Sequence, residues 1–352
     1  MVRYSIIVPV YNRPDEVDEL LQSLCEQDFT DFEVIIVEDG SQVPCEDVCR
    51  RYEDRLDLKY FAKPNSGPGQ SRNYGAERAQ GDWLIVLDSD VVLPKGYLAS
   101  VEKSLNSQLS TVNCQFDAFG GPDAAHDSFT SVQKAISYSM TSFFTTGGIR
   151  GGKKKLDKFY PRSFNMGIRA DVYRELGGFS KMRFGEDIDF SIRIFKGGHS
   201  CRLFPEAWVW HKRRTDFRKF WRQVFNSGIA RINLYKKYPE SLKVVHLLPA
   251  VFTIGCILLV LVSAAGRLLM HFDDLHRWYW LCAAPWIPIL LFCAIIFIDS
   301  SIRNKCLRVG VLSIPAAFIQ LFGYGCGFLQ AWWRRCVLGK DEFSAYNNTF
   351  YK

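Results

Sequence analysis

The run Trp83-Leu84-Ile85-Val86-Leu87-Asp88-Ser89-Asp90 decides the fold class of this chain, because an apolar strand ends abruptly in two carboxylates. A buried parallel strand is continuously apolar, and ligands of open α/β sheets bind just beyond the carboxyl ends of such strands. Two acids separated by one residue project to the same side of an extended chain, where they can share a divalent cation. The alternative is an Asp-rich turn that caps the next helix, and the triplet by itself leaves both interpretations open.

Strand and helix patterns alternate on both sides of this run. Further strands are predicted at residues 5–11, 33–37, 58–62 and 202–210. Helices are predicted at residues 14–27, 71–80, 127–143, 171–176 and 185–196. This alternation is typical of an α/β fold with a doubly wound, mostly parallel sheet. The Gly- and Lys-rich stretch 147–155 is expected to be a mobile loop, which would either close over a ligand or serve as a plain linker.

Polar residues follow several of the predicted strands. Asn12 follows the first strand, Asp39 the second, and Asp88 and Asp90 the Trp83 strand. Because the carboxyl ends of parallel strands meet at one edge of the sheet, we expect these side chains to share one crevice. The sequence therefore predicts a ligand site at this edge.

A second acidic cluster opens the predicted helix at 185–196. Glu186, Asp187 and Asp189 fall in its first turn, where carboxylates interact favourably with the helix dipole. That stabilisation is the simplest explanation for acids in this position. Three acids in four residues nevertheless leave at least one without a purely local reason.

The C-terminal part of the chain is apolar. Three stretches contain no Asp, Glu, Lys or Arg, namely 244–266, 278–298 and 309–333. Each is long enough to cross a bilayer as a helix, which takes roughly 20 residues. We therefore expect a domain at 1–214, an amphipathic helix at 215–240, a membrane domain with about three transmembrane helices at 244–333, and a tail at 334–352.

The helix at 215–240 carries apolar and aromatic residues on one face and Arg and Lys on others. Such a helix just before a membrane span is typical of the bilayer interface, although a core helix with a basic exposed face remains open. The net charge of +7 is concentrated near this region and favours an anionic membrane over nucleic acid as a partner. The 11 cysteines form no Cys-x-x-Cys pair, so neither a zinc site nor a disulfide framework is predicted.

The distribution of basic residues gives a conflicting prediction of topology. Clusters before the first span and between the second and third both favour the cytoplasmic side, and no secretory signal precedes the first strand. We therefore expect a multi-pass protein of the inner membrane with a cytoplasmic catalytic domain. Three crossings would place the basic tail outside, against this preference. The alternative is that Pro and Gly residues make the third segment broken or re-entrant. Three crossings are the prediction.

Five motifs together resemble the family 2 glycosyltransferases of the GT-A fold. They are Ile7-Val8-Pro9-Val10-Tyr11-Asn12, Val37-Glu38-Asp39-Gly40-Ser41, Ser71-Arg72-Asn73-Tyr74-Gly75, Leu87-Asp88-Ser89-Asp90 and Gly185-Glu186-Asp187-Ile188-Asp189. They occur in the family's order and approximate spacing over the first 215 residues or so. The resemblance implies that this domain binds a nucleotide-diphosphate sugar, with a UDP-sugar favoured, and transfers the sugar with inversion.

The resemblance assigns roles on the donor side of the reaction. It implies that the nucleotide is held by Pro9, Tyr11, Asn12 and Asp39, and that Arg72 lies near the donor. Asp90 matches the usual metal contact and Asp88 the acid nearer the sugar, so a divalent cation, Mn²⁺ or Mg²⁺, is implied. His211 is a further candidate ligand, although a lone His is more often structural.

On the acceptor side, Glu186 and Asp187 are similar to the family's Glu-Asp pair. The resemblance implies that Asp187 is the catalytic base, with Glu186 and Asp189 as weaker candidates. A displacement in a single step requires a carboxylate across the sugar from the leaving group, which the metal site cannot supply. Residues lining the sugar or acceptor pocket are implied to be Asn165, Met166 and Gly167.

The sequence also departs from the family's processive members. Those carry Gln-x-x-Arg-Trp on the interfacial helix, where this chain reads Trp221-Arg222-Gln223-Val224. We therefore expect a single addition to a lipid-linked acceptor in glycan or polysaccharide biosynthesis. The alternatives left open are a polyprenyl-phosphate glycosyltransferase, a sugar nucleotidyltransferase and an inactive membrane scaffold.

Overall fold

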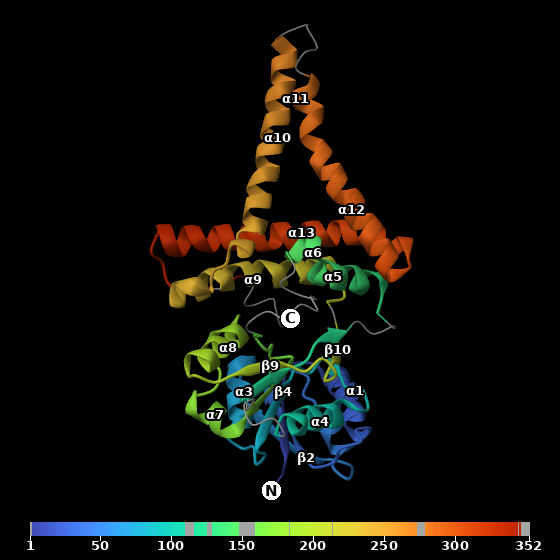
Figure 1. Ribbon diagram of the computed structural model, residues 1–352, viewed down its shortest axis with the longest axis vertical. Helices are drawn as coiled ribbons and strands as arrows, with labels where there is room; N and C mark the ends of the chain where they lie inside the picture. Colours follow the sequence, from blue (N-terminus) through green and yellow to red (C-terminus); the bar gives the residue numbers. More distant parts are fainter. Residues whose placement is uncertain are drawn as a thin grey trace. The chain divides into compact units, whose positions relative to one another are not determined.

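The computed structural model describes residues 2–109, 116–124, 129–147, 159–182, 184–212, 214–272, 279–343 and 345. The chain divides into two compact units (Figure 1). The first comprises Met1–Asp127 and Lys153–Lys212, and the second Ser128–Gly152 and Arg213–Phe350. Apart from Gly147, the loop predicted at 147–155 lies outside the described residues.

A sheet of seven strands forms the centre of the first unit, in the order β3-β2-β1-β4-β8-β6-β9. Its strands are β1 Tyr4–Val10, β2 Phe32–Asp39, β3 Asp57–Lys63, β4 Trp83–Leu87, β6 Ala118–Gly120, β8 Asn165–Arg169 and β9 Cys201–Leu203. Strands β3, β2, β1 and β4 are parallel, whereas β8 runs antiparallel to both β4 and β6. The mostly parallel α/β sheet predicted from the sequence is therefore confirmed.

Helices cover both faces of this sheet. They are α1 Pro14–Cys25, α2 Glu46–Arg50, α3 Pro68–Ala76, α4 Tyr97–Leu109, α7 Ala170–Glu175 and α8 Glu186–Lys196. Successive residues of β1 point to opposite faces, so Val8 joins the apolar cluster with Leu20 of α1, while Ile7 joins the cluster with Phe190 of α8. Two apolar cores on one sheet are what a doubly wound fold requires.

A second sheet of three short strands lies in the same unit, in the order β5-β10-β7. Its strands are β5 Val91–Val92, β7 Asp123–Ala124 and β10 Val209–His211. The single strand predicted at 202–210 is therefore wrong, because the chain leaves the large sheet after β9 and enters the small one at β10. Between them, Pro205 cannot donate a ladder hydrogen bond, and Phe204 turns inward to stack on Phe119 at 4.6 Å.

The second unit is helical. Its helices are α5 Ser131–Thr141, α6 Phe143–Thr146, α9 Phe217–Lys237, α10 Leu248–Phe272, α11 Tyr279–Ala283, α12 Ile287–Asn304 and α13 Leu307–Trp332. Among the described residues, three helical segments are long and apolar enough to cross a membrane, Leu248–His271, Ala284–Asn304 and Leu307–Val337. The helix predicted at 127–143 corresponds to α5 and α6, which pack in this unit although they fall within the predicted 1–214 domain.

Glycines allow α13 to pack closely against its neighbours. A Cβ at Gly323 would lie 2.5 Å from the side chain of Val224, and one at Gly327 would collide with the carbonyl of Phe225, both on α9. Gly325, on another side of α13, faces the first turns of α10. Helix α9 thus buries one face on α13, whereas Lys236 and Lys237 at its end remain exposed.

Candidate active site

Arg72 of α3 links the two acidic clusters that the sequence singles out. Its Nη2 lies 2.6 Å from Oδ1 of Asp88 at the end of β4, and its Nη1 lies 3.2 Å from Oε1 of Glu186 at the start of α8. The side chain of Arg72 is 3% exposed, and its guanidinium lies over the ring of Phe179. A buried cation therefore holds together acids that are about a hundred residues apart in the sequence.

Three candidate metal ligands converge beyond β4. One ligand atom each from Asp88, Asp90 and His211 lies within 4.8 Å of the others. His211 pairs with Val91 across β10 and β5, and the backbone amide of Lys212 donates to the carbonyl of Asp90 at 3.0 Å. The short antiparallel ladder thus places the imidazole beside Asp90, with Nε2 3.2 Å from Oδ1.

The donor set fits a divalent cation. Two carboxylates and an imidazole are a ligand combination suited to Mn²⁺, and carboxylates alone suit Mg²⁺. Within the described part of the chain, the buried Nδ1 of His211 has no hydrogen-bond partner, and the ring stacks on Phe164 at 4.8 Å. Arg13 also reaches this group, with Nη1 2.9 Å from Oδ2 of Asp90. A cation and Arg13 would therefore share the same carboxylate.

The Glu186-Asp187 pair begins α8, and its two carboxyl groups have different surroundings. Burial, and then the negative charge of Asp187, raise the pKa of Glu186 to about 7. Burial also opposes ionisation of Asp187, but the charge and hydrogen bond of Arg162 outweigh it and hold the pKa of Asp187 below its usual value. Nη1 of Arg162 lies 2.9 Å from Oδ2 of Asp187. Asp187 is thus the acid of the pair that is held ionised.

Asp189, the weaker candidate base, has a structural partner. It is fully buried, and its Oδ2 accepts a hydrogen bond at 3.0 Å from Nε of Arg193 one turn later. Arg193 in turn donates to the carbonyls of Leu176 and Gly178. Asp189 therefore anchors α8 on the preceding loop, which accounts for the third acid of the cluster.

Asn12 and its neighbours lie where β1 ends. Asn12 has a φ of 54°, and its Oδ1 accepts hydrogen bonds from the amides of Gln42 at 2.7 Å and Val43 at 3.0 Å. Its side chain therefore ties the end of β1 to the loop after β2. Pro9 is buried within β1, and Tyr11 is half-buried.

Asp39 organises the loop that leads into α3. Its carboxylate accepts hydrogen bonds from the amides of Ser66 and Gly67, each at 2.9 Å, and pairs with Lys63. Only 3% of the residue is exposed. These contacts give Asp39 a structural role in the loop, and a contact with a nucleotide would compete with Lys63 for the same carboxylate.

The three residues expected to line the acceptor pocket belong to β8. Oδ1 of Asn165 accepts from the Tyr97 hydroxyl at 2.6 Å, and its Nδ2 donates to the carbonyl of Ala207 at 2.8 Å. Asn165 and Met166 have no exposed surface, and a side chain at Gly167 would collide with the ring of Phe119. These residues therefore support the sheet beneath the site rather than presenting side chains to an open pocket.

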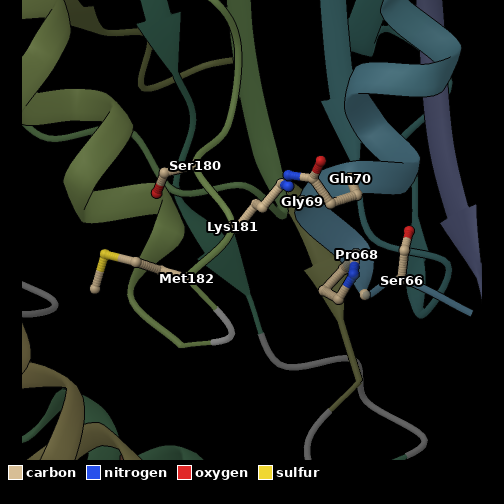
Figure 2. A pocket seen from close by; sticks show the side chains of 8 residues that line it. Ser66, Pro68, Gly69, Gln70, Ser180, Lys181 and Met182 are labelled. Atoms are coloured by element: carbon tan, nitrogen blue, oxygen red, sulfur yellow. The ribbon is translucent and has the colours of Figure 1, made fainter. Parts of the chain in front are cut away.

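A hollow of about 150 Å³ separates the start of α3 from the loop before α8. Figure 2 shows Gly69 and Gln70 on one side and Ser180, Lys181 and Met182 on the other. Asp88, Asp90 and Asp187 are not among its lining residues, and the volume is below the roughly 300 Å³ of small ligand sites. The hollow is therefore not the place where the acids would act.

Sequence reasoning did not assign Arg13, Lys63 and Arg162 to the site, although they contact Asp90, Asp39 and Asp187 respectively. Arg13 directly follows Asn12 at the polar end of the first strand, and this position could have indicated that it belongs to the site. Lys63 ends β3, next to Asp39 in the parallel register. Arg162 has no such signal, because it lies outside the strands and helices and meets Asp187 through the fold alone.

Comparisons with known proteins agree with this geometry. Residues 5–177 match the sequence profile described as Glycosyl transferase family 2. The chain is 34% identical over 116 residues to the poly(ribitol-phosphate) beta-N-acetylglucosaminyltransferase TarS of Staphylococcus aureus, covering 32% of this chain and 20% of that protein. It is 31% identical over 125 residues to the GalNAc(5)-diNAcBac-PP-undecaprenol beta-1,3-glucosyltransferase of Campylobacter jejuni, covering 34% of this chain and 40% of that protein. The matches thus span less than half the length of these relatives.

A solved structure shares the fold. The mannosyltransferase PcManGT of Pyrobaculum calidifontis, determined in complex with GDP-Man and Mn²⁺, aligns with a TM-score of 0.58 at 17% identity, over 91% of this chain and 87% of that one. At this identity the likeness concerns the fold, which is GT-A. With the five motifs and the sheet order, the profile match identifies residues 5–177 as a glycosyl transferase family 2 domain.

Proposed function

We propose that the protein is an inverting glycosyltransferase, which moves a sugar from a nucleotide-diphosphate sugar to a hydroxyl of a membrane-associated, lipid-linked acceptor. The observation that carries this proposal is the position of Arg72 between Asp88 and Glu186. It holds the acids beyond β4 next to the acids that open α8. A transferase of this kind needs one group for the departing diphosphate and a separate base for the attacking hydroxyl.

On the donor side, Asp90, Asp88 and His211 would hold a Mn²⁺ or Mg²⁺ ion, which supplies positive charge to the departing diphosphate. Arg72 and Arg13 lie beside these acids and would donate hydrogen bonds to phosphate oxygens. The nucleotide would lie along the ends of β1 and β2, near Tyr11 and Asp39. A UDP-sugar is the donor we favour, from the resemblance of the motifs.

On the acceptor side, Asp187 is the proposed base. It takes the proton from the acceptor hydroxyl as that oxygen bonds to the anomeric carbon, while the bond from the sugar to the diphosphate breaks on the opposite face. The configuration at the anomeric carbon is therefore inverted. Arg162 supports this role because it keeps Asp187 ionised and able to accept a proton.

The proposed acceptor and location rest on the apolar helices and on one relative. Three helical segments have the length and composition of membrane spans, and the name of the Campylobacter jejuni relative specifies an undecaprenyl-diphosphate-linked acceptor. We infer a multi-pass protein of the inner membrane, with its catalytic unit on the cytoplasmic side. There the acceptor's lipid would remain in the bilayer during transfer.

The test uses the full chain reconstituted in lipid nanodiscs. A panel of radiolabelled nucleotide-sugars is incubated with polyprenyl-diphosphate-linked sugars or with polyprenyl phosphate, and Asp187→Asn serves as the inactive control. We expect a glycolipid product of inverted anomeric configuration by NMR, with release of nucleoside diphosphate. Transfer to polyprenyl phosphate alone would instead support the polyprenyl-phosphate glycosyltransferase. Pyrophosphate release from a nucleoside triphosphate and a sugar phosphate would support the nucleotidyltransferase, and unchanged turnover in Asp187→Asn would exclude the assigned base.

A further inference from the structure

Helix α13 has the composition of a third membrane span, but its neighbours place it elsewhere. We propose that α10 and α12 cross the membrane and that α13 lies along the membrane surface, which leaves the chain's C-terminal tail on the side where α10 begins. The proposal rests on the inferred membrane location and not on the transfer reaction. It concerns contacts within the second unit alone.

The first turns of α13 contact the last turns of α12. A Cβ at Gly310 would lie 2.9 Å from the carbonyl of Phe297. The hydroxyls of Ser313 and Ser300, both fully buried, lie 2.7 Å apart. The N-terminal part of α13 is therefore fixed at the end of α12.

Fifteen residues after Gly310, α13 contacts the first turns of α10. A Cβ at Gly325 would lie 2.5 Å from the carbonyl of Pro249, and would also collide with the side chain of Thr253. At 1.5 Å per residue, the two contact points are about 22 Å apart along the helix. Helix α13 therefore bridges the end of α12 and the start of α10.

If α10 and α12 both cross the membrane, the start of α10 and the end of α12 lie on the same side of it. Figure 1 shows the two helices meeting at their far ends near α11, with α13 running across them at the other ends. A helix that crossed the bilayer after α12 would carry Gly325 about 22 Å toward the far side, level with the end of α10. Instead, Gly325 touches the start of α10, so α13 has run along the membrane rather than through it.

Helix α9 gives an independent indication of the depth of α13. A Cβ at Gly228 of α9 would lie 2.7 Å from the amide of Phe328, so the two backbones are nearly in contact. Lys219 and Lys236, near opposite ends of α9, are exposed. Charged side chains are strongly disfavoured in hydrocarbon, which places α9 at the level of the headgroups. Because α13 packs along α9, it lies close to the same level.

Helix α13 differs from the other two apolar helices in how much of it is buried. In the most apolar 18-residue window of α10 and of α12, 11% of the residues are buried, compared with 44% in α13. Single apolar helices that expose most of their surface need lipid around them. Helix α13 is instead covered by protein on several sides, as expected of a helix that supports the base of the two spans.

Two crossings also remove the conflict in the charge distribution. Most basic residues of this region lie before α10, where α12 ends and α13 begins, and after α13: Lys236, Lys237, Lys243, Arg303, Lys305, Arg308, Arg334, Arg335 and Lys340. With α13 on the surface, all three groups fall on one side of the membrane. This is the arrangement that the positive-inside preference favours.

Site-specific labelling tests the topology without any need for catalysis. Single substitutions Arg308→Cys, Lys340→Cys and Trp280→Cys, all at exposed positions, are made in the full chain in sealed vesicles of known orientation. A membrane-impermeant maleimide is added from one side at a time. The labelled peptides are identified by mass spectrometry, so the native cysteines stay in place.

We expect positions 308 and 340 to be labelled from the same side, and position 280, at the far end of the two spans, from the opposite side. Labelling of position 340 from the side of position 280, or from neither side, would overturn the proposal. Trp280→Cys is the matched control, because its labelling shows that the vesicles are sealed and that α10 crosses them. Failure of sugar transfer would leave this result unaffected, so the two proposals are tested separately.

Discussion

The guanidinium of Arg72 lies 2.6 Å from the carboxylate of Asp88, at the point where β4 gives way to the candidate metal ligands. Replacing Arg72 by alanine would leave Asp88 without this partner and Glu186 buried without its cation. Loss of one partner from a buried ion pair costs about 3–5 kcal/mol. We therefore expect Arg72→Ala to lower the thermal unfolding temperature of the full chain in detergent and to abolish transfer.

Arg51→Ala is the control for this substitution. Arg51 pairs with Asp18, but its side chain is 60% exposed and that of Asp18 is 40% exposed. Pairs of this kind contribute about 0–1 kcal/mol. Equal losses of thermal stability in the two variants would contradict the role assigned to Arg72.

Asp187→Asn should separate chemistry from binding. The amide keeps the shape of the side chain but cannot take the acceptor's proton, so kcat should fall by roughly 10²–10⁴-fold. The KM for the nucleotide-sugar should stay within a few-fold, because the donor contacts are assigned elsewhere. Asp171→Asn, in the first turn of α7, is the control and should retain full activity. A large rise in donor KM with unchanged kcat would argue against a base at position 187.

Arg162→Gln should move the acidic limb of the pH–rate profile. The cation at 2.9 Å lowers the pKa of Asp187, and without it the opposing effect of burial raises that pKa. Because the base must be ionised to act, the variant should lose activity at a higher pH than the wild type as the solution is acidified. The check is kcat/KM measured from pH 4 to pH 9, and a limb that stays in place would show that Asp187 does not limit the rate at low pH.

Substitutions at Asp90 and Arg13 should have opposite effects on metal binding. Asp90→Asn removes a carboxylate from the group of three ligands, so Mn²⁺ affinity should fall at least about tenfold. Arg13→Gln removes the cation that pairs with the same carboxylate at 2.9 Å, so Mn²⁺ affinity without nucleotide should rise. Free Mn²⁺ measured by EPR during titration distinguishes the two. Arg50→Gln, on an exposed arginine of the same unit, should change nothing.

Gly327→Ala should destabilise the second unit, whereas Gly255→Ala should not. A methyl group at position 327 would collide with the carbonyl of Phe225 and force α9 and α13 apart, at a cost of about 1–3 kcal/mol. At Gly255, on α10, no atom of the described residues outside the helix's own nearby backbone lies within 4 Å of the added carbon. Thermal stability of the two variants in the same detergent gives the comparison, and similar losses would contradict the close packing of α9 on α13.

The sequence predicts the central part of the first unit well, because β1, β2 and β4 are long, apolar and followed by polar residues. It does not predict β5 or β7, each of two residues, because so short a strand has no periodicity to detect. The position of His211 beside Asp90 depends on this small sheet. The contacts of Arg72 with Asp88 and of Arg162 with Asp187 depend on the fold of distant segments, and composition contains no sign of them.

The three apolar helices show a different limit of prediction from sequence. Hydropathy identifies α10, α12 and α13 correctly as long apolar helices, since it measures only the cost of exposing each segment to water. Hydropathy carries no information on the direction in which a helix runs. For α13, that direction is set by the glycines that bring it against α9 and α10. Pro315 does not break α13, although it was a reason to consider a broken or re-entrant segment.

The pairing of His211 with Val91 also fixes an order of events during synthesis. Asp88 and Asp90 leave the ribosome with the first third of the chain, but the imidazole beside them follows more than a hundred residues later, immediately before α9 and the apolar helices. Domains generally fold as units from the N-terminus during synthesis. In this chain, the group of three candidate ligands would be completed only as the apolar helices begin to emerge, so the first unit would lack one of these ligands until then.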